Sequence, residues 1–102
     1  MRQPQTWNQR YDKASQAVPD CVLLMRIGDF YEAAKDSADV LADVCGIPLA
    51  VQMTGRRLAG FQSYNLSQVI DLLHRRGHTV AVLEPGDKLP TIHRIHPWLV
   101  EA

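Results

Sequence analysis

Residues 21–32 read CVLLMRIGDFYE, and this stretch decides the fold. Its first part, residues 22–27, is apolar except for Arg26 and is too short for a helix, so it predicts a short and largely buried strand. The string GDFYE, residues 28–32, follows directly and places two aromatic side chains between two carboxylates. A chain that leaves the core usually enters a polar turn, so this aromatic pair needs an explanation.

Helical and strand patterns alternate along the rest of the chain. Apolar side chains recur every three or four positions in residues 7–17 and 31–45, which predicts two amphipathic helices. Thr6 is placed to cap the first helix, which Pro19 ends, and Gly46 is placed to end the second.

A third helix is expected around the apolar residues from Leu66 to Leu73, with Ser63 or Asn65 as its cap and Gly77 as its end. Further strands are expected at residues 49–53, 58–61, 79–83 and 91–95. Helices interleaved with short strands predict a single small α/β domain over residues 1–102, with a mixed sheet flanked by helices.

Composition narrows the class of protein. The chain has 102 residues and no net charge, and it lacks an apolar segment long enough for a signal peptide or a membrane span. Its two cysteines, Cys21 and Cys45, have apolar neighbours and no CxxC spacing, which predicts buried free thiols in a reducing cytoplasm.

The charges are unevenly distributed even though they sum to zero. Six acidic residues lie between positions 20 and 45, whereas residues 52–80 hold four arginines against one aspartate. The arginines Arg56 and Arg57 fall in a predicted turn, and Arg75 and Arg76 fall at a helix end. They are candidates for phosphate contacts, and a solvated surface explains them equally well.

The sequence offers little catalytic chemistry. It has no phosphate-binding GxxxxGK[ST] loop and no nucleophile elbow, and its histidine pairs (His74 with His78, and His93 with His96) lack a third metal ligand nearby. We therefore expect a non-enzymatic protein without a metal or another cofactor. A nuclease built from Asp29, Glu32 and Glu84 is a weaker alternative, because isolated carboxylates are common.

With its flanks included, the opening stretch resembles the N-terminal mismatch-recognition domain, domain I, of the MutS DNA mismatch repair family. The matching residues, at the family's spacing, are Tyr11, Pro19-Asp20, residues 23–27 and GDFYE at 28–32. Residues 58–61 and 70–77 match a later motif, and residues 80–87 match loosely. Gln62-Ser63-Tyr64 departs from the family, which has Pro-Tyr-His there.

The resemblance implies a MutS domain I-like fold and separate roles within GDFYE. Phe30 would be a wedge that enters the minor groove and stacks on a mispaired base, and Glu32 would hydrogen-bond that base. Gly28 would let the backbone turn close to the groove, while Tyr31 would belong to the core. From pattern alone, the simpler interpretation is that both aromatic residues are core residues at a strand-to-helix junction.

The implied partner is double-stranded DNA, preferably mismatched, and other repair or replication proteins are further candidates. In the family this domain precedes connector, lever, clamp and ATPase domains, so the chain is either a stand-alone relative or a piece of a larger protein. Residues 98–102 are typical of a natural end. The alternative function is a protein-interaction or regulatory domain that keeps the fold without recognising DNA.

Overall fold

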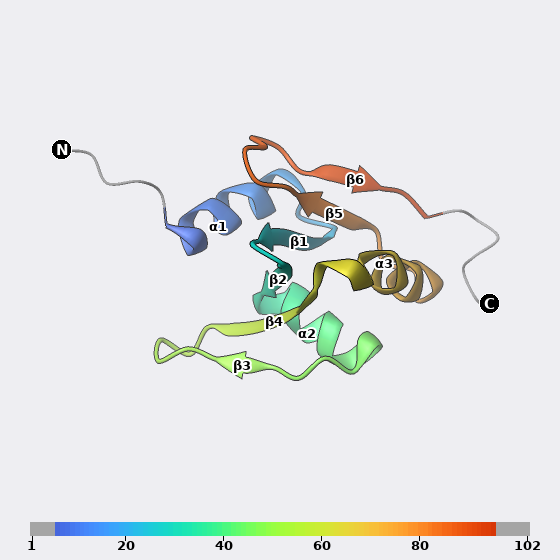
Figure 1. The fold of residues 1–102 in the computed structure, drawn as a ribbon, viewed down its shortest axis with the longest axis horizontal. Coiled ribbons are helices and arrows are strands. Elements are labelled where there is room, and N and C mark those ends of the chain that lie inside the picture. Colours follow the sequence, from blue (N-terminus) through green and yellow to red (C-terminus); the bar gives the residue numbers. More distant parts are fainter. Residues whose placement is uncertain (1–5, 96–102) are drawn as a thin grey trace.

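The computed structural model describes residues 6–95, in which three helices surround one sheet (Figure 1). The helices are α1 (Trp7–Ala17), α2 (Lys35–Cys45) and α3 (Leu66–Arg75), and a 3-10 turn at Ser63–Asn65 precedes α3. The strands are β1 (Val22–Ile27), β2 (Phe30–Ala34), β3 (Ala50–Val51), β4 (Arg57–Gln62), β5 (Val80–Leu83) and β6 (Thr91–His93).

The six strands form one mixed sheet in the order β3-β4-β2-β1-β5-β6. The central strand β1 pairs with β5 in parallel and with β2 antiparallel, and the remaining pairs are antiparallel. This confirms the predicted α/β fold. The four buried apolar residues at the start of β1 lie at the middle of the sheet, as a strand covered on both faces requires.

Each face of the sheet has its own apolar cluster, because successive side chains of a strand point to opposite faces. On one face, Leu24 and Tyr31 lie in a cluster with Leu41 of α2 and Leu73 of α3. On the other face, a second cluster joins α1 to side chains of the strands. Its members are Tyr11, Ala14, Val18, Leu23, Met25, Ala34, Ala81 and Leu83.

The prediction of a helix from residue 31 onward is wrong for its first turn. Residues 30–34 form strand β2, and α2 begins only at Lys35. The spacing of Tyr31 and Ala34 imitates a helical period, but the two side chains belong to opposite faces of the sheet. Antiparallel pairing of β2 with both β1 and β4 overrides the local pattern.

The predicted element ends are partly confirmed. Thr6 caps α1 in a capping box with Gln9, as expected for its first turn. Neither Ser63 nor Asn65 caps α3 through its side chain, because a 3-10 turn occupies these positions. The outer strands are shorter than predicted: β3 covers two residues and β6 three.

Both cysteines are free, and they are half-buried rather than fully buried. Burial raises the pKa of each thiol, with Asp20 adding to the effect at Cys21. His74 is buried, and its Nε2 lies 2.9 Å from the carbonyl oxygen of His93. His96 lies outside the described residues. Within residues 6–95, no helix has the length and hydropathy to cross a membrane.

Candidate nucleic-acid interface

The string GDFYE forms the tip and second strand of a β-hairpin. Ile27 pairs with Phe30, so Gly28 and Asp29 make a two-residue loop. Gly28 has a φ of +58°, a conformation that L side chains rarely adopt, which explains why glycine stands there. The Ser63 amide donates a hydrogen bond of 2.8 Å to the Asp29 carbonyl, tying the loop to the start of the 3-10 turn.

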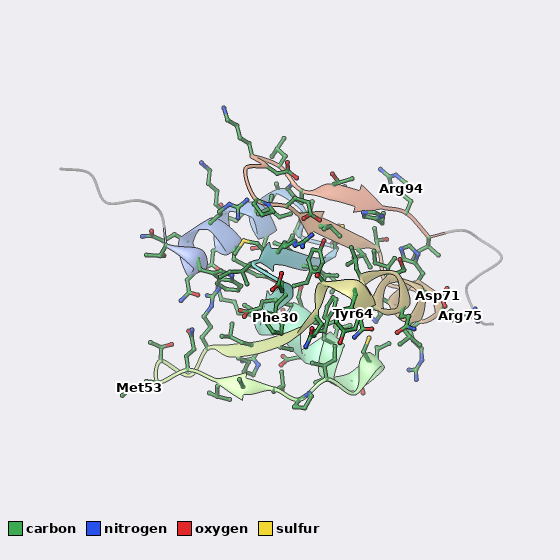
Figure 2. The ribbon with its side chains drawn as sticks, viewed as in Figure 1. Phe30, Met53, Tyr64, Asp71, Arg75 and Arg94 are labelled. Atoms are coloured by element: carbon green, nitrogen blue, oxygen red, sulfur yellow. The ribbon has the colours of Figure 1, made fainter. Side chains whose placement is uncertain are left out.

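Phe30, which is labelled in Figure 2, lies in the row of the sheet nearest the hairpin loop. Its cross-strand partners are Ile27 on β1 and Gln62 on β4, and such partners share a face. Helix α1 covers this face at Met25 but leaves the row nearest the hairpin loop uncovered. Phe30 is therefore 45% exposed and Ile27 is 44% exposed, so the interpretation of Phe30 as a core residue is wrong.

Glu32 occupies the next position along the same face, between Met25 and Gly60. It is half-buried, and within residues 6–95 its carboxylate has neither a hydrogen bond nor an ion pair. Burial alone raises the pKa of this carboxyl group. A partly dehydrated carboxylate beside an exposed ring is a ready acceptor for an external donor, and it takes up a proton more easily than a free glutamate.

We expect Glu32→Gln to stabilise the free domain at neutral pH and to leave its stability unchanged near pH 3. The raised pKa of Glu32 means that the folded state disfavours the charged form, so the penalty develops as the pH rises from the ordinary glutamate range through the folded-state pKa. Urea unfolding at several pH values measures the difference. A difference in free energy of unfolding between the two proteins that stays the same at every pH would contradict the raised pKa of Glu32.

Tyr31 projects from the opposite face and fixes the strand that carries Phe30 and Glu32. It is buried, as the sequence predicts, and its ring stacks on Phe61 with 5.8 Å between centroids. Its hydroxyl donates a 2.6 Å hydrogen bond to Glu84 Oε2. Burial, then Glu84, raises the pKa of Tyr31. The Arg26 guanidinium lies 5.6 Å from the ring centroid and donates to the Gly28 carbonyl.

Tyr31→Phe should destabilise the domain by about 1 kcal/mol, because it removes a hydrogen bond to a carboxylate that is itself partly exposed. Thermal unfolding at pH 7 measures the loss. Tyr64→Phe is the matched control, since that hydroxyl belongs to a ring that is 77% exposed. An equal effect of both variants would show that the Glu84 bond does not stabilise the hairpin.

The sequence that forms this fold and hairpin matches a known protein family. The MutS domain I family matches residues 5–96, which is nearly the whole chain. The chain belongs to the MutS domain I family. The DNA mismatch repair protein MutS of Porphyromonas gingivalis is 36% identical over 90 residues, covering 81% of this chain and 10% of the relative. MutS of Chlamydia muridarum is 37% identical over 83 residues, covering 81% and 10%.

MutS of Rhodopirellula baltica is 35% identical over 79 residues, covering 74% of this chain and 9% of the relative. The chain thus spans about a tenth of the length of the curated MutS relatives it matches. The similarity concerns one domain of a much longer protein.

The arginines of this MutS domain I chain do not lie beside Phe30. Ala34, the last residue of β2, pairs with Leu58, so Arg56 and Arg57 lie at the opposite end of the strand from Phe30. Arg75 and Arg76 lie at the far end of α3, where the chain returns to the start of β5. Figure 2 shows Arg75 at the outer end of that helix, next to Asp71.

Three of these arginines form ion pairs within the domain. Arg56 makes two hydrogen bonds with Asp12, and Arg57 makes two with Asp39. These bonds lower the pKa of both aspartates, with the arginine hydrogen bond as the largest cause. Arg75 pairs with Asp71 one helical turn earlier. Arg76 is exposed and has no ion pair within the described part of the chain.

The carboxylates considered for a nuclease are not brought together. Glu84 accepts its bond from Tyr31 on one face, whereas Glu32 lies on the other. Among residues 6–95, no group of three or more His, Cys, Asp or Glu side chains is arranged to hold a metal ion.

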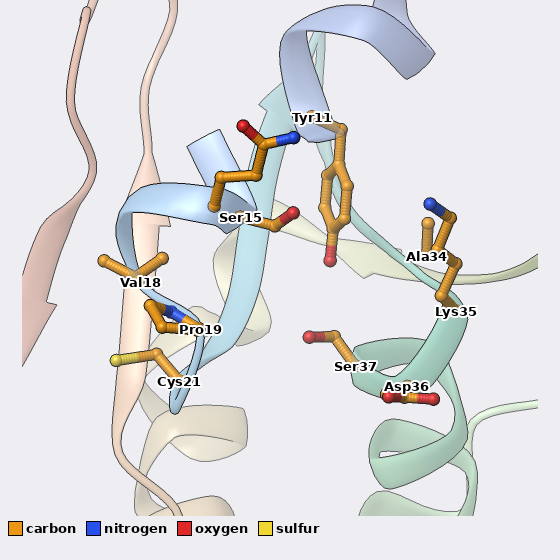
Figure 3. Close-up of a pocket in the computed structure, with 10 residues that line it drawn as sticks. Tyr11, Ser15, Val18, Pro19, Cys21, Ala34, Lys35, Asp36 and Ser37 are labelled. Carbon is orange, nitrogen blue, oxygen red and sulfur yellow. The ribbon is translucent and has the colours of Figure 1, made fainter. Parts of the chain in front are cut away.

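A pocket of about 330 Å³ lies between the end of α1 and the start of α2 (Figure 3). Its hydroxyl groups are used internally: Tyr11 donates to the Leu23 carbonyl at 2.8 Å, and Ser37 Oγ accepts from the Leu23 amide at 3.0 Å. These bonds hold both helices to β1.

Sequence reasoning missed two exposed side chains near the hairpin, Ile27 and Tyr64. Ile27 belongs to an apolar run, and only the β1–β2 register places it at the uncovered end of the sheet. Tyr64 follows the Ser63 amide that binds the hairpin loop. The signal for Tyr64 was its departure from the family's Pro-Tyr-His.

Proposed function

We propose that this domain binds double-stranded DNA and recognises mispaired or distorted sites by inserting Phe30 from the minor-groove side. The observation that carries the proposal is the half-exposed Phe30 ring at the uncovered end of the hairpin, with the Glu32 carboxylate, which is unpaired within residues 6–95, next to it on the same face. Membership of the MutS domain I family supports it. The proposed role is recognition without catalysis.

The energetics favour defective duplex over intact duplex. Inserting a ring between base pairs requires unstacking, which costs a few kcal/mol and less where pairing is already faulty. Stacking of a base on an aromatic ring returns about 1–3 kcal/mol. The return exceeds the cost only at weak sites, so Phe30 selects weak pairing without reading a sequence.

Glu32 increases the preference for mismatched duplex because its carboxylate weakens the binding of ordinary duplex. A carboxylate near phosphates is repelled, and the repulsion is compensated only where a displaced base offers a hydrogen-bond donor or where the carboxyl group is protonated. The raised pKa of Glu32 favours the protonated route. Gly28 contributes by letting the loop pass close to the groove, and Tyr31 holds the strand from the opposite face.

Phosphate contacts are proposed for the arginines as secondary, positioning interactions. Arg76 is the first candidate. Arg75 and Arg57 would each exchange an exposed ion pair with an aspartate for one with a phosphate. For Arg56, such a contact requires breaking its bonds with Asp12. With few such contacts and no net charge, binding should be weak, at about micromolar affinity or worse in physiological salt.

The test is a fluorescence-anisotropy titration of the domain with two duplexes that differ only by one mismatched pair, at about 50 mM salt to strengthen weak binding. The expected result is tighter binding of the mismatched duplex. Equal affinity for both, or no binding of either, would refute the proposal.

A protein-interaction function is the second candidate, and one observation favours it. The edge strand β3 and its flanks expose three apolar side chains at alternate positions, namely Leu49, Val51 and Met53. An exposed apolar edge is a typical docking site for another chain. Capture of a repair or replication protein that Val51→Asp abolishes, with no DNA binding at low salt, would support this function over the first.

A further inference from the structure

Gly60 differs from the other five glycines of the chain. Those five all have positive φ angles between +58° and +87° and open space where a side chain would stand, so turns and helix ends explain them. Gly60 lies inside strand β4 without a positive φ. Glycine inside a strand costs stability, and it often marks a place where another group approaches closely.

The approaching group is the side chain of Glu32. Gly60 pairs directly with Glu32 across β2 and β4. A Cβ atom at Gly60 would lie 3.2 Å from Glu32 Cγ and 3.9 Å from its Cδ. The same atom would lie 3.3 Å from the Tyr31 carbonyl oxygen, so the neighbouring backbone limits relaxation as well. The missing side chain therefore provides the space over which the Glu32 methylenes lie.

The other neighbours of Glu32 do not fix the direction of its side chain, so its contact with Gly60 is the one that can. On the β1 side stands Met25, which is buried under α1 and closes that route. On the β4 side a shallow hollow of about 140 Å³ is lined by Glu32, Pro48, Ala50, Leu58, Ala59 and Gly60. Since no cation within residues 6–95 pairs with the carboxylate, packing over Gly60 is the contact that can set its position.

We infer that Gly60 is a specificity-determining positioning residue. It holds the Glu32 side chain in place, so that the carboxyl group lies beside Phe30 and can contact the base on which Phe30 stacks. The inference rests on the proposed function and adds a residue that touches no DNA in this scheme. A methyl group at position 60 would push Glu32 Cγ away by a few tenths of an ångström and turn the carboxyl group from its place.

The experiment is a double-mutant cycle with Gly60→Ala, Glu32→Ala and both changes together. In the free domain, Gly60→Ala should lower Tm by about 5 °C or more in the wild-type background and by clearly less in the Glu32→Ala background, where Cγ and Cδ are absent. In binding, Gly60→Ala should lower the ratio of mismatched to matched affinity by about 3-fold to 10-fold. The double variant should then lose no more than Glu32→Ala alone.

The two readouts separate the failure of this inference from failure of the proposed function. Equal Tm losses in both backgrounds, or an unchanged affinity ratio in a folded Gly60→Ala domain, would overturn the role of Gly60. A wild-type domain without mismatch preference refutes the proposed function, and the Tm cycle still decides whether Gly60 seats Glu32. If Gly60→Ala alone fails to fold, folding of the double variant supports the inference, and its failure overturns it.

Discussion

Phe30→Ala should lower the affinity for mismatched duplex by about tenfold or more and leave the weak affinity for matched duplex nearly unchanged. The asymmetry is expected because ring stacking contributes only where a base step opens. The ring is half-exposed, so its loss should cost the fold less than about 1 kcal/mol, the scale of one cross-strand pair with Ile27. Anisotropy titrations measure the affinities, and thermal unfolding measures the stability.

Two variants show whether the ring itself matters. Phe30→Trp keeps a stacking surface and should retain the preference for mismatched duplex. Leu89→Ala removes an exposed apolar side chain elsewhere and should change neither affinity. A Phe30→Ala domain that binds both duplexes as the wild type does would refute the wedge. An equal loss on both duplexes would show that Phe30 contributes general adhesion rather than recognition.

The fold was largely predictable because its strongest signals are local. The run before Gly28 and the helical periods of α1 and α3 depend on neighbouring residues, and they appear where expected. Strand β2 was not predictable, since its pairing with β4 depends on residues far away in sequence, and only β1 is its neighbour along the chain. Without that register, the exposure of Phe30 and the contact between Glu32 and Gly60 remain invisible.

The arginines illustrate the same limit for the site. A turn containing Arg56 and Arg57 predicts solvent exposure and free charge, yet the partner of Arg56 is Asp12, 44 positions earlier. Charge placement along a sequence reveals an excess of one sign but not the ion pairs that neutralise it. Within the hairpin, residues that are close in sequence are also close in space, since Ile27 pairs with Phe30 across the loop of Gly28 and Asp29.

Asp12→Asn should be the most destabilising of these substitutions for the fold, at about 3 kcal/mol, which corresponds to a fall in Tm of roughly 10–20 °C for a domain of this size. Arg56 is only 10% exposed, and its guanidinium carbon lies 5.7 Å from the Trp7 ring centroid. Its Nη atoms lie 2.9 and 3.2 Å from the two Asp12 oxygens, and its Nε has no hydrogen-bond partner among the residues that the structure describes. The amide would leave a buried cation without a counter-charge.

The stabilisation that Asp12 gives the fold should decrease in acid. The Arg56 hydrogen bonds hold the pKa of Asp12 below its usual value, so this stabilisation is complete above the ordinary aspartate range and is lost as the pH falls through the lower folded-state pKa. The gap in free energy of unfolding between wild type and Asp12→Asn should therefore narrow in acid.

Asp71→Asn is the control, because it removes an ion pair with Arg75 in which both side chains are about half exposed, worth about 0.3–0.5 kcal/mol. Urea unfolding of the three proteins at pH 7 and pH 3 measures both effects. Equal losses for the two variants at pH 7, or a gap that stays constant into acid, would show that the Asp12–Arg56 pair does not hold α1 to the turn before β4.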